Sequence, residues 1–218
     1  MSSIPSRVLE RLRRPLPDLG AYLASQVVSA LWRRSLNRAG RGFYVGRGAQ
    51  LQGGSAINIG DGFHAGQMLW IEAVLQYREF RYEPVIEIGN EVICSQGVHI
   101  AATTRVTIHD GVLLGSRVHI TDHGHGSYHG LSQAAPDVPP SRRPLAEGRP
   151  VVIGRNVWLG DGVVVLPGVS IGEGTIVGAN SVVSRNLPAR VIAVGAPAVP
   201  IKKFDDTSGQ WIAIGGPA

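Results

Sequence analysis

Along residues 153–188, an aliphatic residue recurs at every sixth position without interruption. A small or β-branched residue usually follows four places after it, and the six units read IGRNVW, LGDGVV, VLPGVS, IGEGTI, VGANSV and VSRNLP. An amphipathic helix repeats its apolar face every three to four residues and a strand every two, so neither explains a period of six. The period predicts a three-sided coil with one short strand on each side, and coils of about 18 residues that stack into a solenoid.

The same period occurs earlier in the chain, with interruptions. Hexads occupy residues 59–70, 88–105 and 108–125, and the pattern then stops until Ile153. The intervening residues 124–150 are rich in proline, glycine and polar residues, a composition typical of a loop. Because loops of this length inside a compact fold are usually functional, we expect residues 124–150 to leave the solenoid wall and contribute to a site.

Residues 1–41 show apolar residues at helical spacing instead, and Pro15 and Pro17 divide them into two predicted helices. Their clustered arginines explain much of the net charge of +5. One interpretation is a cap over the open end of the solenoid. Another is a basic amphipathic segment on an anionic membrane surface. The chain then divides into a helical cap or appendage at 1–41, a β-helix at 42–204 and a C-terminal tail at 205–218.

The composition further limits the classes of protein to which this chain can belong. A chain of 218 residues with 29 glycines and few charges fits one all-β solenoid core. No apolar run is long enough for a transmembrane helix, and arginines interrupt the N-terminal apolar stretches where a secretory signal would be continuous. We therefore expect a cytoplasmic protein. The single cysteine, Cys94, opens a hexad and is expected to point inward as a structural thiol. Nucleic-acid binding is not indicated, because the basic residues are not interleaved with stacking aromatic residues.

The candidate chemistry lies where the regular coil breaks off, in the stretch DHGHGSYH. It contains His123, His125 and His129. An imidazole titrates near neutral pH and is the natural general base for a hydroxyl or an amine, and Asp122 or another nearby acceptor could fix its tautomer. No GxSxG motif occurs, and Cys94 is expected to be buried, so a covalent acyl-enzyme is not indicated. Direct transfer between two bound substrates is the simpler scheme.

Together, the hexads, the ITDHGH break, the NVWLG and PGV units and the closing GAPA resemble the hexapeptide-repeat acyltransferases over residues 45–204. Within that family the chain is most similar to the sugar and polysaccharide O-acetyltransferases of the galactoside and maltose acetyltransferase branch. The resemblance implies a left-handed parallel β-helix, against the usual right-handed crossover rule. It also implies a homotrimer with active sites between subunits, acetyl-CoA as donor, a sugar or glycan acceptor and no metal.

Carried over residue by residue, the resemblance implies His123 as the catalytic base, with His125 as its rival. It implies contacts to acetyl-CoA from Trp158, Asp161, Ala179, Ser184, Arg185 and Lys202. The cationic residues suit the phosphates of coenzyme A, and a backbone N–H near Gly160 is expected to stabilise the oxyanion. The acceptor pocket departs from the galactoside pattern, because Gly66 stands where those enzymes carry an asparagine.

Three alternatives remain open at this point. An N-acetyltransferase acting on an amino-sugar nucleotide shares the fold and the histidine base. A β-helical metalloenzyme would need three convergent histidines, for which His119, His123 and His125 are the candidates. A non-catalytic scaffold is disfavoured by the DHGHG break, which a purely structural solenoid does not need.

Overall fold

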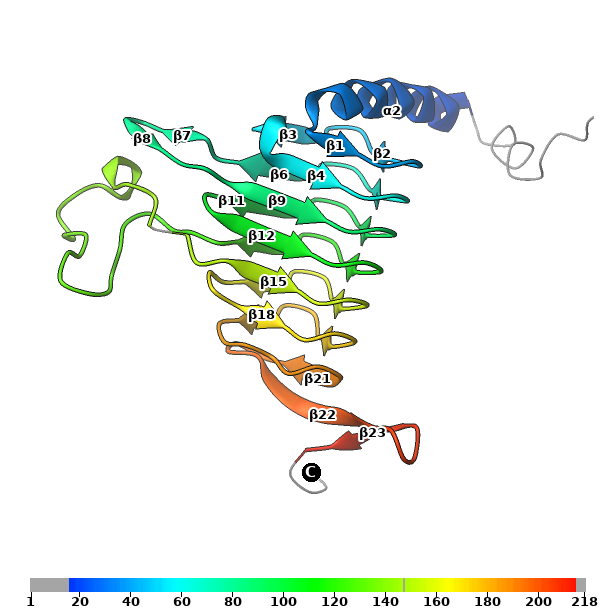
Figure 1. Ribbon diagram of the computed structural model, residues 1–218. Helices are drawn as coiled ribbons and strands as arrows, with labels where there is room; N and C mark the ends of the chain where they lie inside the picture. The colour runs from blue at the N-terminus through cyan, green and yellow to red at the C-terminus, as the bar shows by residue number, and fades with distance from the viewer. Residues whose placement is uncertain (1–15, 147, 215–218) are drawn as a thin grey trace, which may run out of the picture.

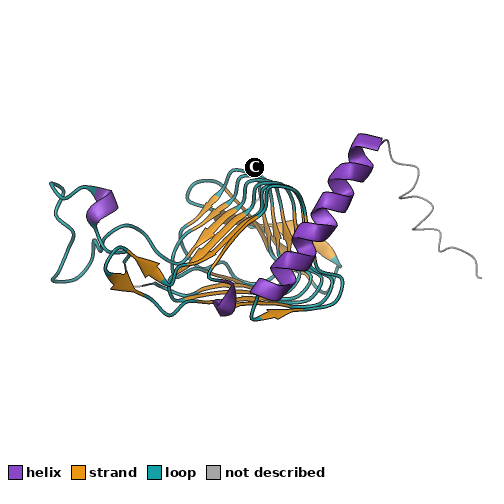
Figure 2. Ribbon diagram, turned by 90° about the horizontal axis from the view of Figure 1, so that it is seen from above, coloured by secondary structure: helices purple, strands orange, loops and turns teal. Residues whose placement is uncertain are grey.

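The computed structural model describes residues 16–146 and 148–214. It shows three sheets of stacked short strands that wind around one core, and Figures 1 and 2 show the stack from the side and from above. Strands that neighbour one another within a sheet come from successive coils and are parallel through most of the stack. The predicted all-β, left-handed parallel β-helix is confirmed.

The three walls of the solenoid correspond to the three sheets. Wall 1 contains β1 (Arg38–Ala39), β4 (Ile57–Ile59), β9 (Val85–Ile88), β12 (Arg105–Ile108), β15 (Val151–Ile153) and β18 (Ser170–Ile171). Wall 2 contains β2 (Tyr44–Val45), β5 (His64–Ala65), β10 (Ile93–Cys94), β13 (Leu113–Leu114), β16 (Trp158–Leu159), β19 (Ile176–Val177) and β21 (Val191–Val194), and then β22 (Val199–Asp205) and β23 (Gln210–Ala213). Wall 3 contains β3 (Gln50–Gln52), β6 (Trp70–Ala73), β11 (His99–Ala102), β14 (His119–Thr121), β17 (Val164–Val165) and β20 (Val182–Val183).

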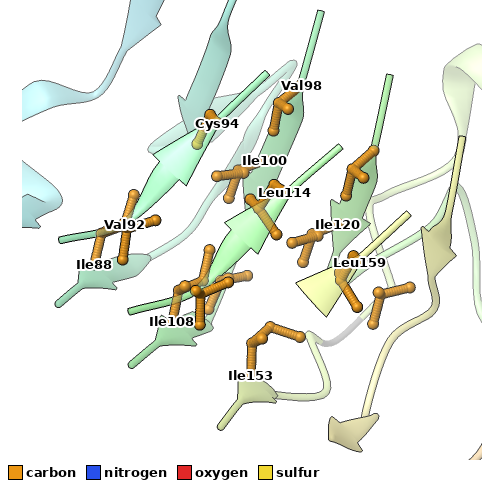
Figure 3. Close-up of a cluster of buried hydrophobic side chains, with 14 of the residues drawn as sticks. Ile88, Val92, Cys94, Val98, Ile100, Ile108, Leu114, Ile120, Ile153 and Leu159 are labelled. Carbon is orange, nitrogen blue, oxygen red and sulfur yellow. The ribbon is translucent and has the colours of Figure 1, made fainter. Parts of the chain in front are cut away.

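The hexad pattern maps directly onto the core. The residue that opens each hexad points inward, and so does the residue two places before it, and both kinds are buried. Figure 3 shows such side chains, including Ile88, Cys94 and Ile100 of one coil above Ile108, Leu114 and Ile120 of the next. Identical registers in successive coils align these residues in columns, so that each coil buries the apolar ends of its neighbours. Cys94 lies inside this core, and burial raises the pKa of its thiol to about 12.

The N-terminal end of the stack is covered by α2 (Leu16–Ser35). Trp32 and the following Leu36 are buried against the first coil, and the Ser29 hydroxyl accepts a hydrogen bond from the Val45 backbone N–H at 2.9 Å. The opposite face of α2 exposes Leu23, Val27 and Leu31. The helix predicted before Pro15 lies outside the described residues, and the membrane-surface interpretation stays a prediction. Over the described part of the chain, no helix has the length and apolar character needed to cross a bilayer.

The opposite end of the stack is closed by antiparallel strands. β22 folds back along β21, and β23 pairs antiparallel with β22, so the parallel order of wall 2 ends there. Trp211 of β23 packs edge-on against Phe204 of β22, with ring centroids 5.3 Å apart. Residues 205–213, within the segment predicted as a tail, thus form part of this hairpin.

Two excursions leave the walls at the same corner of the coil, after wall 3, and lie on one side of the molecule in Figure 1. The first is the hairpin of β7 (Gln76–Tyr77) and β8 (Phe80–Arg81). The second is the loop of residues 124–150, which contains the 3-10 turn η2 (Pro140–Arg142). Arg143 organises this loop, because its buried guanidinium donates hydrogen bonds to the Val138 carbonyl and the Tyr128 hydroxyl.

Candidate active site

The site is built around His123 and Asp122, at the point where wall 3 gives way to the loop. Asp122 is fully buried, and its Oδ1 lies 2.8 Å from Nδ1 of His123. An ionised carboxylate can only accept hydrogen bonds, so this contact places the proton on Nδ1. The other ring nitrogen, Nε2, is then left with a free lone pair. This is the arrangement that a general base needs.

Asp122 is itself held by the backbone of the preceding coil. Its carboxylate accepts hydrogen bonds from the N–H groups of Thr103 at 2.9 Å, Thr104 at 2.8 Å and Arg105 at 2.7 Å. Burial by itself raises the pKa of Asp122, but the hydrogen bonds from His123 and from these N–H groups outweigh it and lower the pKa below its usual value. The carboxylate is therefore ionised and fixed in place at neutral pH.

A ladder of aromatic rings lies beside this dyad on the outer face of wall 3. Trp70 stacks on His99 with ring centroids 4.1 Å apart, and Nδ1 of His99 lies 3.1 Å from Nδ1 of His119. Burial lowers the pKa of His99 to about 4, with a further contribution from His119 and His123, and burial also lowers the pKa of His119. The depressed pKa values favour neutral imidazoles at both positions at neutral pH.

His123 separates two cavities. The first has a volume of about 320 Å³ and lies between wall 3 and the hairpin, with Glu72, Tyr77, His125 and Leu145 among its lining residues. The second, of about 1200 Å³, lies under the loop and is lined by Tyr128, His129, Arg149 and Pro167 among others. Because its side chain borders both spaces, His123 is placed to act on a group bound in either of them.

His125, the rival base, has a different environment. Its exposed ring meets Tyr77 edge-on at 5.4 Å between centroids, and its backbone forms an isolated bridge with Leu145. The buried Asp122 carboxylate contacts His123 and not His125. The geometry therefore favours His123 as the base, and His125 lines the adjacent cavity.

The residues predicted to contact acetyl-CoA lie in three places. Trp158 and Lys202 share one row across the outer face of wall 2, because Trp158 pairs with Ile176, Ile176 with Ile192, and Ile192 with Lys202. Asp161 and Ala179 lie at the corner between walls 2 and 3. Ser184 and Arg185 lie at the corner after wall 3, as His123 does, but two strands further along the stack. All six are exposed, and none of them lines either cavity beside His123.

Two groups with predicted roles, the Asp161 carboxylate and the Gly160 N–H, form hydrogen bonds between coils. The Asp161 carboxylate accepts a hydrogen bond from the Ser116 N–H at 2.7 Å, as Asp61, Asn90 and Asp110 do for the N–H groups of the coils before them. The Gly160 N–H donates to the Val177 carbonyl at 2.8 Å. The Gly160 N–H itself is therefore already used between coils, and the expectation that a backbone N–H near Gly160 stabilises the oxyanion stays a prediction.

The histidines that a metal site would require do not converge. Among residues 16–146 and 148–214, no group of three or more His, Cys, Asp or Glu side chains is arranged to hold a metal ion. His119 faces His99, His123 faces Asp122, and His125 meets Tyr77. In the described residues, His123 is thus paired with a carboxylate and not with the other histidines.

Sequence reasoning missed Glu72 and Tyr77, which line the smaller cavity, and the Trp70–His99 stack beside them. The hexad pattern carried a signal for Trp70, His99 and Glu72, because they occupy outward positions of wall 3 strands, between the inward aliphatic residues. No feature of the hexad pattern pointed to Tyr77, since it belongs to an excursion outside the repeat.

Comparison with protein families and known proteins agrees with this architecture. The family model described as bacterial transferase hexapeptide (six repeats) matches residues 150–185. WbbJ of Escherichia coli strain K12, to which a role as an O-acetyl transferase of lipopolysaccharide biosynthesis is ascribed, is 40% identical over 157 residues. The match covers 72% of this chain and 76% of that protein.

Solved structures show the same fold at lower identity. AntD, an N-acyltransferase from Bacillus cereus solved with dTDP-4-amino-4,6-dideoxyglucose and coenzyme A, matches with a TM-score of 0.64 at 20% identity, over 82% of this chain and 90% of that chain. The hexapeptide-repeat-containing acetyltransferase VCA0836 from Vibrio cholerae matches with a TM-score of 0.50 at 22% identity, over 84% of this chain and 82% of that chain. At these identities the likeness concerns the fold alone.

Proposed function

Because the chain belongs to the hexapeptide-repeat acyltransferase family, we propose that it transfers an acetyl group from acetyl-CoA to a hydroxyl group of a sugar or polysaccharide precursor. The observation that carries the proposal is the Asp122–His123 dyad at the junction of two cavities. The 40% identical relative with an ascribed O-acetyl transferase role supports oxygen as the accepting atom.

In the proposed reaction, Nε2 of His123 removes the proton from the acceptor hydroxyl as that oxygen attacks the thioester carbonyl carbon. The carbon–sulfur bond then breaks, and the imidazolium returns the proton to the departing sulfur, so that free coenzyme A and the acetyl ester leave. The Asp122 carboxylate, 2.8 Å from Nδ1, stabilises the imidazolium formed between these steps. A base is needed here because a hydroxyl, unlike a free amine, must lose its proton to become a good nucleophile.

The donor is proposed to lie along the corners and outer faces that carry Trp158, Asp161, Ala179, Ser184, Arg185 and Lys202. Arg185 and Lys202 supply positive charge for the phosphates of coenzyme A. Since these residues lie on different walls of one chain, we propose that they meet in pairs across the subunit interfaces of a homotrimer. Sedimentation of the purified protein tests that assembly directly.

The test is release of free thiol from acetyl-CoA with a panel of simple sugars, amino sugars, nucleotide sugars and glycan oligomers. We expect acceptor-dependent release that falls by about two to four powers of ten in His123→Ala. His109→Ala is the matched control, because His109 is an exposed histidine at a corner remote from both cavities.

The possible outcomes separate the remaining alternatives. Release with amino sugars but not with their hydroxyl counterparts would replace O-acetylation by N-acetylation. Loss of activity in His125→Ala together with normal turnover in His123→Ala would reverse the assignment of the base. Absence of both acetyl-CoA binding and thiol release would leave the scaffold interpretation.

A further inference from the structure

The smaller cavity beside His123 is enclosed by segments that lie far apart in the sequence. The Tyr77 hydroxyl donates to the Ser141 carbonyl at 2.8 Å, and Nε of Arg78 donates to the same carbonyl at 2.6 Å. The Leu145 N–H donates to the Tyr82 hydroxyl at 2.9 Å. These bonds tie the β7–β8 hairpin to the loop of residues 124–150. The walls of the cavity are therefore held together by hydrogen bonds between the hairpin segment and the loop.

Glu72 supplies the carboxylate of this cavity. It lies on the outer face of β6, and its side chain is 24% exposed. Its Oε2 is 3.9 Å from Nε2 of His99, which is too far for a hydrogen bond. None of the hydrogen bonds found among residues 16–146 and 148–214 reaches the Glu72 carboxylate. Its oxygens can therefore accept hydrogen bonds from a ligand in the cavity. Burial raises the pKa of Glu72, and the nearby His123 opposes that rise.

The remaining lining suits a sugar ring. The amide of Gln52 offers both donor and acceptor groups, and the Tyr77 and His125 rings form an aromatic wall. A pocket that combines a few convergent polar groups with aromatic surface is the usual form of a small-molecule site. The base, His123, lies in the same lining, so a hydroxyl bound here is within reach of proton transfer.

We propose that this cavity is the acceptor site and that it takes an uncharged sugar residue, one hydroxyl of which donates a hydrogen bond to Glu72 while another faces His123. A carboxylate in a half-buried cavity attracts hydroxyl donors and repels phosphate, so the acceptor is a glycoside or glycan and not a nucleoside diphosphate sugar. This inference rests on the proposed acetyl transfer and names the substrate class for it.

The test measures acetyl transfer to matched acceptors that differ in charge. Methyl glycosides of glucose, galactose, mannose and rhamnose are compared with UDP-glucose, UDP-galactose, GDP-mannose and dTDP-rhamnose. We expect at least one uncharged glycoside to have a higher kcat/KM than its nucleotide counterpart. A nucleotide sugar that is the better acceptor in every active pair would overturn the proposal, and the absence of both acetyl-CoA binding and transfer to any acceptor would instead refute the proposed function.

The role of Glu72 is tested with Glu72→Gln, which keeps the shape of the side chain and removes its charge. We expect the acceptor KM to rise by about tenfold or more, since hydrogen bonds to charged groups are the stronger ones, while the KM for acetyl-CoA stays unchanged. The control is Glu79→Gln, because Glu79 is an exposed residue of the same hairpin that does not line the cavity.

A second variant, Gln52→Trp, places a bulky ring at the cavity wall from an exposed position. We expect it to abolish acceptor use while acetyl-CoA binding persists. If acetyl transfer proceeds with unchanged acceptor KM in both Glu72→Gln and Gln52→Trp, the acceptor binds elsewhere, and the proposed function stands without this site.

Discussion

Replacing Asp122 by asparagine is the sharpest single perturbation of the proposed mechanism. The carboxylate uses both oxygens. Oδ1 accepts from the Thr103 N–H and contacts His123, and Oδ2 accepts from the N–H groups of Thr104 and Arg105. Asparagine has almost the same shape but turns one of these acceptors into a donor. Whichever way the amide is turned, at least one backbone N–H group of the site loses its acceptor.

The two orientations of the amide have different consequences. If its oxygen faces His123, the N–H groups of Thr104 and Arg105 lose their acceptor. Each such loss costs about 1–3 kcal/mol. If its oxygen faces those N–H groups, the amide NH₂ faces Nδ1 of His123, which must then accept a hydrogen bond. The ring proton moves to Nε2, and the base is lost. We therefore expect Asp122→Asn to lower stability by about 2–6 kcal/mol or to lower kcat by about two to four powers of ten.

The assay pairs thiol release from acetyl-CoA with urea unfolding of the same samples. Asp110→Asn is the matched control, because Asp110 makes the same kind of inter-coil bond to the Asn90 N–H at 2.8 Å but lies away from His123. We expect it to retain normal kcat. The reasoning is refuted if Asp122→Asn keeps both its full kcat and the unfolding midpoint of the wild type, since the asparagine must lose one or the other.

Three further outcomes follow from the structure. In the folded protein the pKa of His99 is lowered from 6.5 to about 4, so the unfolded chain binds a proton at this residue more readily. The contribution of His99 to the free energy of unfolding is therefore complete above pH 6.5 and is lost as the pH falls towards 4. His99→Gln should therefore reduce the loss of urea stability between pH 7.5 and pH 5, by about 1–2 kcal/mol after solvent screening. The Cys94 thiol, whose pKa is about 12, should react with Ellman's reagent only on unfolding, and rapid labelling of the native protein would contradict its burial. Arg185→Ala and Lys202→Ala should each raise the KM for acetyl-CoA by about tenfold and leave the acceptor KM unchanged, and unchanged donor KM values would remove both from the donor site.

The solenoid could be predicted from the sequence because each of its repeats is encoded by six consecutive residues. A hexad that opens with an inward aliphatic residue specifies a short strand, a corner and a burial pattern, and the columns such as Cys94 over Leu114 follow from stacking equal coils. The break in the repeat drew attention to three histidines, and the family resemblance, not the period, selected His123 among them. The role of Asp122 as a hydrogen-bond acceptor for the adjacent histidine was suggested by their proximity in the sequence, but its three backbone donors belong to the preceding coil and appear only once the coils are stacked.

The cavity beside His123 was not predictable, because its contacts obey no period. The bond between Tyr77 and Ser141 joins residues separated by 64 positions, and the hairpin and the loop meet only because each leaves the coil at the same corner. An excursion disturbs neither the hexads before it nor those after it, since the parallel pairing of β6 with β11 and of β14 with β17 continues across each gap. Acceptor specificity can therefore change through the length and composition of the excursions while the stacked coils keep the dyad in place. Under the proposed function, the repeat fixes the position of His123, and the two excursions select the hydroxyl that is brought to it.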